Sequence, residues 1–249
     1  MSKTKRLRIF AGPNGSGKST IFPEICQKFG AGLYLNADKI EDDLTRNAFL
    51  DLTDFGLDLK QEDWDEFCSA SNSKTLVQKA LNEGFDVNVR INDNIILTNP
   101  EKTNSYIASL ITIFLCRHLT RKGISYSLES VMSHPSKLNQ IEEAKKNGFK
   151  VYLYFVCVED PSINVSRVCN RVTKGGHQVP AEKIISRYSK TLDLLYSALL
   201  LVDNCYFFDN STEEMKLIAT YINGELILEI NENELPSWFI KAVTNKIQI

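Results

Sequence analysis

Short apolar runs alternate with stretches of helical apolar spacing along most of the chain. The runs that predict strands are 6–11, 33–35, 126–128, 151–158 and 205–208. The stretches that predict helices are 18–29, a segment from Asn36, 103–121, 135–148, a segment from Asp160, 184–199 and 212–222. Strands that alternate with helices indicate a parallel sheet with right-handed crossovers. The run 151–158 is almost continuously apolar, as expected for a central strand that is covered on both faces. The pattern predicts an α/β fold with a mostly parallel five-stranded sheet flanked by helices.

The pattern weakens between residues 45 and 100, where acidic and aromatic residues mix. A helix that ends at Gly84 and a small strand pair between residues 87 and 98 are the elements we expect there. We interpret 45–100 as an insertion in a single domain of residues 1–249, and 224–249 as a tail packed on the edge of the sheet.

The first strand and the first helix are joined by a glycine-rich turn. Residues Gly12 to Ser19 fit G-x-x-x-x-G-K-[ST] in full. This motif between a strand and a helix predicts a P-loop, in which backbone N–H groups and the helix N-terminus bind phosphate. Lys18 would reach the β- and γ-phosphates of ATP, and the Ser19 hydroxyl would bind Mg²⁺. The residues we expect to bind the nucleotide are Gly12, Asn14, Gly15, Ser16, Gly17, Lys18, Ser19 and Thr20.

Carboxylates follow other predicted strands at the same edge of the sheet. Asp38, Glu129 and Asp209 each come just after a strand, as Gly12 does, so one crevice could collect them. Asp38 could orient and deprotonate an acceptor hydroxyl or hold Mg²⁺ through water, but Asn36 and Asp38 also both suit a helix N-cap. Glu129 could line the acceptor site, and a cap or a salt bridge explains it equally well.

An arginine pair precedes a glycine loop. Arg167 and Arg171 are four residues apart on one predicted helix and are followed by Gly175 and Gly176. Residues 160–180 therefore suit a lid whose arginines bind the transferring phosphate, although a solvated basic face is the alternative. Arg187 could add charge to the site or lie on the surface, and His177 gives no decisive signal.

Composition narrows the function classes. The chain has 29 Lys and Arg residues and 31 Asp and Glu residues, which gives a net charge of −2. It therefore has no excess of positive charge of the kind that binds a nucleic acid backbone. The six cysteines form no C-x-x-C pair, which indicates small buried thiols in a reducing compartment. No apolar stretch is long enough to span a bilayer, and the basic N-terminus precedes a strand, so we expect a cytoplasmic protein.

Four segments together resemble the zeta-toxin family of P-loop kinases, in particular the chromosomal branch often labelled predicted ABC-type ATPases. They are Gly12–Ser19, Asn36–Ile40, Glu129–Ser133 and Arg167–Pro180, with Asp209–Ser211 in agreement. The resemblance covers 6–40 and about 103–211. The chain has no L-S-G-G-Q signature, so nothing supports the ABC label itself.

The resemblance implies ATP- and Mg²⁺-dependent phosphorylation of a UDP-sugar such as UDP-N-acetylglucosamine. It implies that Asp38 is the base, that Glu129 lines the acceptor and metal side, and that Arg167 and Arg171 are lid arginines. An antitoxin-like protein is the partner that such a kinase would have.

A small-molecule kinase is therefore the leading hypothesis. The alternative is a nucleotide-dependent ATPase switch that acts through a protein partner, suggested by the acidic, aromatic segment 45–100 and by Trp238 and Phe239 in the tail. A polynucleotide kinase would need a basic groove, for example around Lys145, Lys146 and Lys150. The near-neutral net charge of the chain argues against this function.

Overall fold

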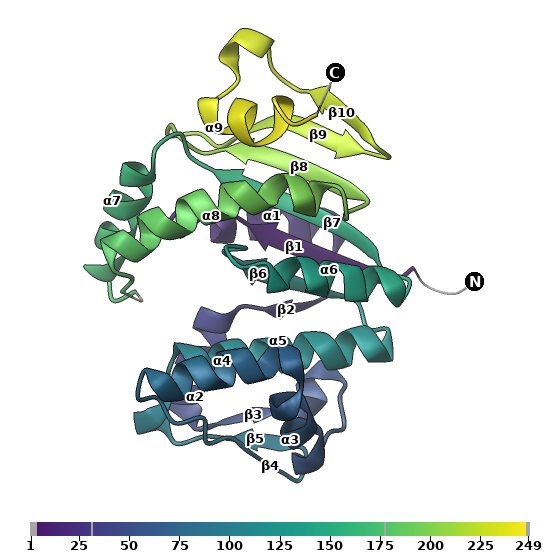
Figure 1. Ribbon diagram of the computed structural model, residues 1–249, viewed down its shortest axis with the longest axis vertical. Coiled ribbons are helices and arrows are strands. Elements are labelled where there is room, and N and C mark those ends of the chain that lie inside the picture. The colour runs from purple at the N-terminus through teal and green to yellow at the C-terminus, as the bar shows by residue number, and fades with distance from the viewer. Residues whose placement is uncertain (1–3, 31, 177, 248–249) are drawn as a thin grey trace. The chain divides into compact units, whose positions relative to one another are not determined.

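The computed structural model describes residues 4–30, 32–176 and 178–247 and divides the chain into two compact units (Figure 1). The first unit comprises Met1–Gly32 and Tyr126–Ile249, and the second comprises Leu33–Ser125. The second unit extends beyond 45–100 at both ends, and the prediction of a single kinase-like domain with an insertion stays a prediction.

The first unit carries the main sheet. Its strands are β1 (Arg6–Ala11), β6 (Tyr126–Ser130), β7 (Lys150–Cys157), β8 (Asn204–Asp209), β9 (Lys216–Ile222) and β10 (Glu225–Leu228). They lie in the order β10-β9-β8-β7-β1-β6. Strands β6, β1, β7 and β8 are parallel, and β7 is buried along most of its length, so the predicted mostly parallel sheet with a central strand at 151–158 is confirmed.

Helices cover both faces of this sheet. The helical elements of the first unit are α1 (Lys18–Phe29), α6 (Ser136–Lys146), α7 (Pro161–Val172), α8 (Ala181–Leu199), the short η3 (Glu232–Glu234) and α9 (Ser237–Phe239), and the π-helix η4 (Ile240–Thr244). Helix α1 packs through Ile21 on Phe10, Tyr154 and Val156. Phe155, the neighbour of Tyr154 on β7, contacts Trp238 of α9 instead. Successive side chains of a strand point to opposite faces, so α1 and α9 cover opposite faces of the sheet.

The predicted helix at 212–222 is wrong. Residues 216–222 form β9, which pairs antiparallel with β8 and, through a hairpin, with β10. The β-branched Ile218, Thr220 and Ile222 fit a strand, and Asn223-Gly224 takes the positive φ angles (54° and 92°) of a tight hairpin turn. Residues 216–228 thus extend the sheet with two antiparallel strands.

The second unit contains four α-helices, two short 3-10 helices and a small sheet among its described residues. Its elements are β2 (Leu33–Leu35), α2 (Ala37–Asn47), β3 (Phe49–Asp51), η1 (Leu52–Phe55), α3 (Gln61–Ser69), α4 (Ser71–Asn82), β4 (Arg90–Asn92), β5 (Ile95–Leu97), η2 (Pro100–Lys102) and α5 (Ser105–Lys122). Strands β4 and β5 confirm the predicted strand pair, and β3 adds a third antiparallel strand on the other side of β5.

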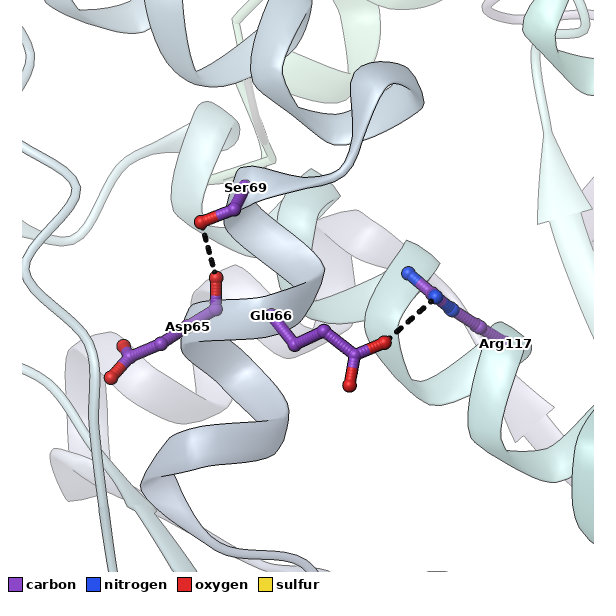
Figure 2. A network of polar contacts seen from close by, with 4 residues as sticks. All are labelled: Asp65, Glu66, Ser69 and Arg117. Atoms are coloured by element: carbon purple, nitrogen blue, oxygen red, sulfur yellow. Dashed lines mark hydrogen bonds and ion pairs between the residues drawn. The ribbon is translucent and has the colours of Figure 1, made fainter.

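An aromatic cluster joins the helices of the second unit. The rings of Trp64 and Phe67 on α3 contact Phe114 on α5 with centroid distances of 5.2 and 5.3 Å. At the surface, Arg117 of α5 lies 3.4 Å from the carboxylate of Glu66. Within α3, the hydroxyl of Ser69 donates to the backbone carbonyl of Asp65 (Figure 2). A half-exposed ion pair contributes little to the free energy of folding, so the buried rings supply most of the stabilisation of the α3–α5 contact.

No helix among the described residues is long and apolar enough to cross a membrane. All six cysteines are free thiols; Cys116, Cys157 and Cys205 are buried as predicted, whereas Cys169 is exposed.

Candidate nucleotide-binding site

The turn after β1 is shaped by three glycines with positive φ. Gly12, Gly15 and Gly17 have φ angles of 145°, 76° and 105°, a region that other residues rarely adopt. A Cβ atom at Gly12 would also collide with the carbonyl of Val156, and one at Gly15 would lie 2.8 Å from the carbonyl of Asn164. The turn is therefore a narrow, closely packed loop that leads into α1, and glycine-rich loops before a helix are the geometry in which N–H groups bind phosphate.

Lys18, the first residue of α1, is buried with its charged end over the loop. Its ammonium donates to the carbonyl oxygens of Gly12 (3.0 Å) and Pro13 (2.9 Å). These bonds compensate for the removal of the charge from water. The side chain is thus held at the loop, where it could exchange carbonyl partners for phosphate oxygens.

Ser19 and Glu129 come together from α1 and β6. The Ser19 hydroxyl lies 3.1 Å from Oε2 and 3.4 Å from Oε1 of Glu129. The structure thus places Glu129 beside the residue that the P-loop motif assigns to the metal. A hydroxyl and a carboxylate are oxygen ligands of the kind that Mg²⁺ prefers. No cluster of three or more acidic, His or Cys side chains that could hold a metal occurs in the described part of the chain, so phosphate oxygens and water would complete the coordination.

Side chains from α7, α8 and the β8–β9 loop support the backbone of the P-loop. Asn164 donates to the carbonyl of Asn14 (2.7 Å), and Asn210 donates to the carbonyl of Ser16 (2.8 Å). Arg187 of α8 donates to the side-chain oxygen of Asn14 (3.3 Å). The structure therefore places Arg187 at the site, which the sequence left undecided.

Asn164 and Asn210 were not predicted as site residues. Asn164 is a fully buried polar residue on an amphipathic helix, a position that requires a polar partner. That partner is 150 positions away in the sequence, and the partner of Asn210 is 194 positions away. Only the polarity of Asn164 in an apolar pattern could have drawn attention to it.

Three buried polar atoms of the P-loop and α7 have no hydrogen-bond partner among the described residues. They are Oγ of Ser16, Oδ1 of Asn164 and Nη1 of Arg167, whose Nη2 donates to the carbonyl of Thr212 (3.4 Å). Buried polar atoms are normally satisfied by a partner. Phosphate oxygens would supply one for the Ser16 hydroxyl, so this residue fits a bound nucleoside triphosphate.

Tyr188 fixes the part of α8 that carries Arg187. Its hydroxyl donates to the carbonyls of Val158 (2.8 Å) and Glu159 (3.1 Å) just after β7. Burial raises the pKa of Tyr188 well above its ordinary value, so the phenol stays neutral and keeps donating these bonds.

Several predicted site residues are not brought to the P-loop by any contact within the first unit. Arg171 is exposed, and its carbonyl accepts the amide of Gly176 (3.0 Å), so its lid role stays a prediction. His177 lies outside the described residues. Asp209 accepts from the indole of Trp238 (2.8 Å) and from Ser211, and so contacts the C-terminal segment.

Asp38 belongs to the second unit, where it is an exposed residue in the first turn of α2. The N-cap of α2 is Asn36, whose side-chain oxygen accepts from the amides of Asp38 (2.9 Å) and Lys39 (3.3 Å). Capping therefore does not explain the Asp38 carboxylate, and its role as a base stays a prediction.

No protein-family model matches the chain. An uncharacterised protein of Haemophilus influenzae (strain ATCC 51907 / DSM 11121 / KW20 / Rd) is 26% identical over 125 residues, which are 49% of this chain and 89% of that protein.

Solved structures resemble the chain over most of its length. A chain of the AvrRxo1-ORF1:AvrRxo1-ORF2 complex with ATP is 15% identical, with a TM-score of 0.57 over 91% of this chain. A chain of the PezAT chromosomal toxin–antitoxin system of Streptococcus pneumoniae is 12% identical, with a TM-score of 0.51 over 96% of this chain and 76% of that one. The fold of this chain is therefore similar to the folds of the AvrRxo1 and PezAT chains. At these identities the likeness concerns the fold alone, and this chain spans 61% of the length of the AvrRxo1 chain.

Proposed function

We propose that the protein is an ATP-dependent phosphotransferase that moves the γ-phosphoryl group of ATP to a hydroxyl of a small acceptor. The observation that carries this proposal is the contact of Ser19 with Glu129 beside the buried Lys18, because it combines a metal-binding pair with a phosphate-binding ammonium on one P-loop. The Ser16 hydroxyl of the P-loop supports it, since it lacks a partner that phosphate oxygens could supply.

In the proposed reaction, the acceptor oxygen forms a bond to the γ-phosphorus while the bond from that phosphorus to the β–γ bridging oxygen breaks. ADP leaves, and the proton of the acceptor hydroxyl passes to the carboxylate of Asp38. Lys18, Arg167 and Arg171 offset the charge that develops on the phosphoryl oxygens. Ser19 and Glu129 would hold Mg²⁺, which supplies further charge neutralisation when bound.

A nucleotide sugar such as UDP-N-acetylglucosamine is the acceptor that the resemblance suggests. The PezAT system and the AvrRxo1-ORF1:AvrRxo1-ORF2 complex are assemblies of two proteins, which favours an antitoxin-like partner for this chain as well.

Incubation with ATP, Mg²⁺ and a panel of nucleotide sugars, followed by mass spectrometry of the small molecules, tests the activity. We expect one acceptor to gain the mass of one phosphate and Lys18→Met to abolish the gain. ATP binding without transfer to any acceptor of the panel would favour the nucleotide-dependent switch instead.

The base is tested separately with Asp38→Asn. Removing a general base slows transfer by about 10²–10⁴-fold. Asp42→Asn, four residues further along α2 and also exposed, is the matched control and should keep the parent rate. Equal rates for the two variants would rule out Asp38 as the base.

A further inference from the structure

The C-terminal segment of the protein, Ser237–Thr244, is attached to the ends of two central strands by carboxylates. Glu159, after β7, accepts the backbone amide of Ser237 (3.0 Å) and also its hydroxyl. Asp209, the last residue of β8, accepts the indole N–H of Trp238 (2.8 Å). Two acidic groups at the strand ends where ligands bind in such sheets are thus used to hold a segment of the chain itself.

Ser211 connects the Asp209 carboxylate with the backbone of Glu159. Its hydroxyl donates to Asp209 (2.8 Å) and accepts the amide of Glu159 (2.8 Å), and its own amide donates to Asp209 (3.1 Å). The turn Asp209–Ser211 therefore keeps a fixed shape for as long as the Asp209 carboxylate and the Ser211 hydroxyl accept these hydrogen bonds.

Asn210 lies in the middle of this turn and supports the P-loop. Its amide N–H donates to the carbonyl of Cys157 (2.8 Å), and its side chain donates to the carbonyl of Ser16 (2.8 Å). The side-chain nitrogen of Asn210 lies so close to Gly17 that a Cβ atom there would overlap it. Two hydrogen bonds, joined by the peptide link between Asp209 and Asn210, thus form a path that connects Trp238 with the P-loop.

Aromatic packing fixes the far end of this path. Trp238 is 2% exposed and contacts Phe155 of β7 at a centroid distance of 5.8 Å. Phe239 is fully buried and contacts Phe207 of β8 at 5.0 Å. The indole is therefore held rigidly enough for its N–H to set the position of Asp209.

We propose that Trp238 is a positioning residue for the P-loop, so that the affinity for nucleotide depends on the C-terminal segment. The indole orients Asp209, and the Asp209–Ser211 turn presents Asn210 to the Ser16 carbonyl. The proposal rests on the nucleotide-binding half of the proposed function and needs neither an acceptor nor a transfer step.

Hydrogen exchange of the nucleotide-free protein tests the proposal in Trp238→Phe. Phenylalanine keeps most of the packing but removes the N–H donor. We expect backbone amides of residues 12–20, among them Ser16 and Thr20, to exchange about five- to tenfold faster, the size expected for one lost hydrogen bond. Trp64→Phe is the matched control, because Trp64 is equally buried (3% exposed) but belongs to the second unit.

The same pair of variants is then titrated with ATP. Trp238→Phe should raise the Kd for ATP about five- to tenfold, while Trp64→Phe should leave it within twofold. A general loss of stability would accelerate exchange throughout the first unit and would not favour residues 12–20. Equal exchange of residues 12–20 in the two variants overturns the proposal.

Asp209→Asn covers the case in which Trp238→Phe does not fold. It keeps the shape of the side chain but removes the charge that accepts the indole N–H, and should produce a smaller acceleration confined to the same amides. Unchanged exchange of residues 12–20 in this variant would equally contradict the path. If the protein binds ATP but transfers no phosphate, the proposed kinase activity is wrong. The exchange and ATP-affinity measurements would still test the role of Trp238.

Discussion

At the scale of single residues, Glu129 contacts Ser19, and in the proposed function these two side chains hold Mg²⁺. In Glu129→Gln the neutral amide keeps the shape but loses the charge, so we expect the Mg²⁺ concentration for half-maximal transfer to rise by about tenfold or more, as for a lost metal partner. Magnesium titrations of the transfer rate measure this. Glu142→Gln on the exposed side of α6 should titrate like the parent, and an unchanged titration for Glu129→Gln would remove Glu129 from the metal site.

A second residue-scale prediction concerns Asp203, which accepts from Lys145 (2.6 Å) and from the Val151 amide (2.7 Å). Burial alone would raise the pKa of the Asp203 carboxyl, but these hydrogen bonds outweigh burial and lower it below its ordinary value. A lowered folded-state pKa stabilises the fold above the unfolded-state pKa of about 3.9, and this contribution is lost as the pH falls through the folded-state pKa.

Asp203→Asn should therefore lower the free energy of unfolding at pH 7 by about 1 kcal/mol, an estimate discounted for partial exposure. Urea unfolding at pH 7, 5 and 3 measures the difference, which should persist at pH 5 and shrink toward pH 3. The exposed Asp193→Asn is the matched control for removing one carboxylate charge. A difference of constant size down to pH 3 would contradict the assignment.

What the sequence reveals about a residue depends on how local its partners are. Lys18 and Ser19 were predictable because the P-loop motif encloses them and the loop carbonyls that Lys18 contacts. Asn210 was not predictable as a P-loop support, because its partner is Ser16. Asn210 reaches Ser16 because β8 and β1 lie on either side of β7 in the sheet. This strand order cannot be inferred from a single sequence.

At the scale of elements, the β9–β10 hairpin depends on its turn. Gly224 has a φ of 92°, and a Cβ atom there would meet no other atom within 4 Å. Gly224→Ala should therefore destabilise the hairpin through backbone strain alone, by roughly 1–2 kcal/mol. Thermal unfolding and hydrogen exchange of β10 amides measure this loss. Asn223→Gly, whose φ is also positive, should be tolerated, and a Gly224→Ala protein as stable as the parent would refute the strain argument.

The same hairpin shows why one element was mispredicted. Strands followed by crossover helices are the rule in a parallel sheet, and that rule favoured a helix after β8. The local signals pointed the other way, since Asn223-Gly224 between two apolar segments is a strong hairpin signal. The helices α1 and α5 were predicted within one or two residues, because apolar periodicity and a terminal glycine agreed there.

At the scale of the whole molecule, the boundary between the units was harder to predict than the elements on either side of it. The weak pattern of 45–100 suggested an insertion, whereas the compact second unit runs from Leu33 to Ser125. Its helices α2 and α5 have strong helical patterns of their own, so they looked like parts of the parallel sheet domain. Tertiary contacts decide which helices pack together, and the apolar periodicity of a sequence does not reveal those contacts.

The second unit has its own aromatic core, and we therefore expect a fragment of residues 33–125 to fold alone. Trp64, Phe67 and Phe114 are 3%, 2% and 0% exposed and contact one another within this unit. Urea unfolding followed by Trp64 fluorescence should show one cooperative transition. Phe114→Ala should lower the free energy of unfolding by about 3–5 kcal/mol, and Phe49→Ala, which is 49% exposed on β3, by less than about 1 kcal/mol. A fragment with a gradual, featureless loss of signal would show that this core needs the rest of the chain to form.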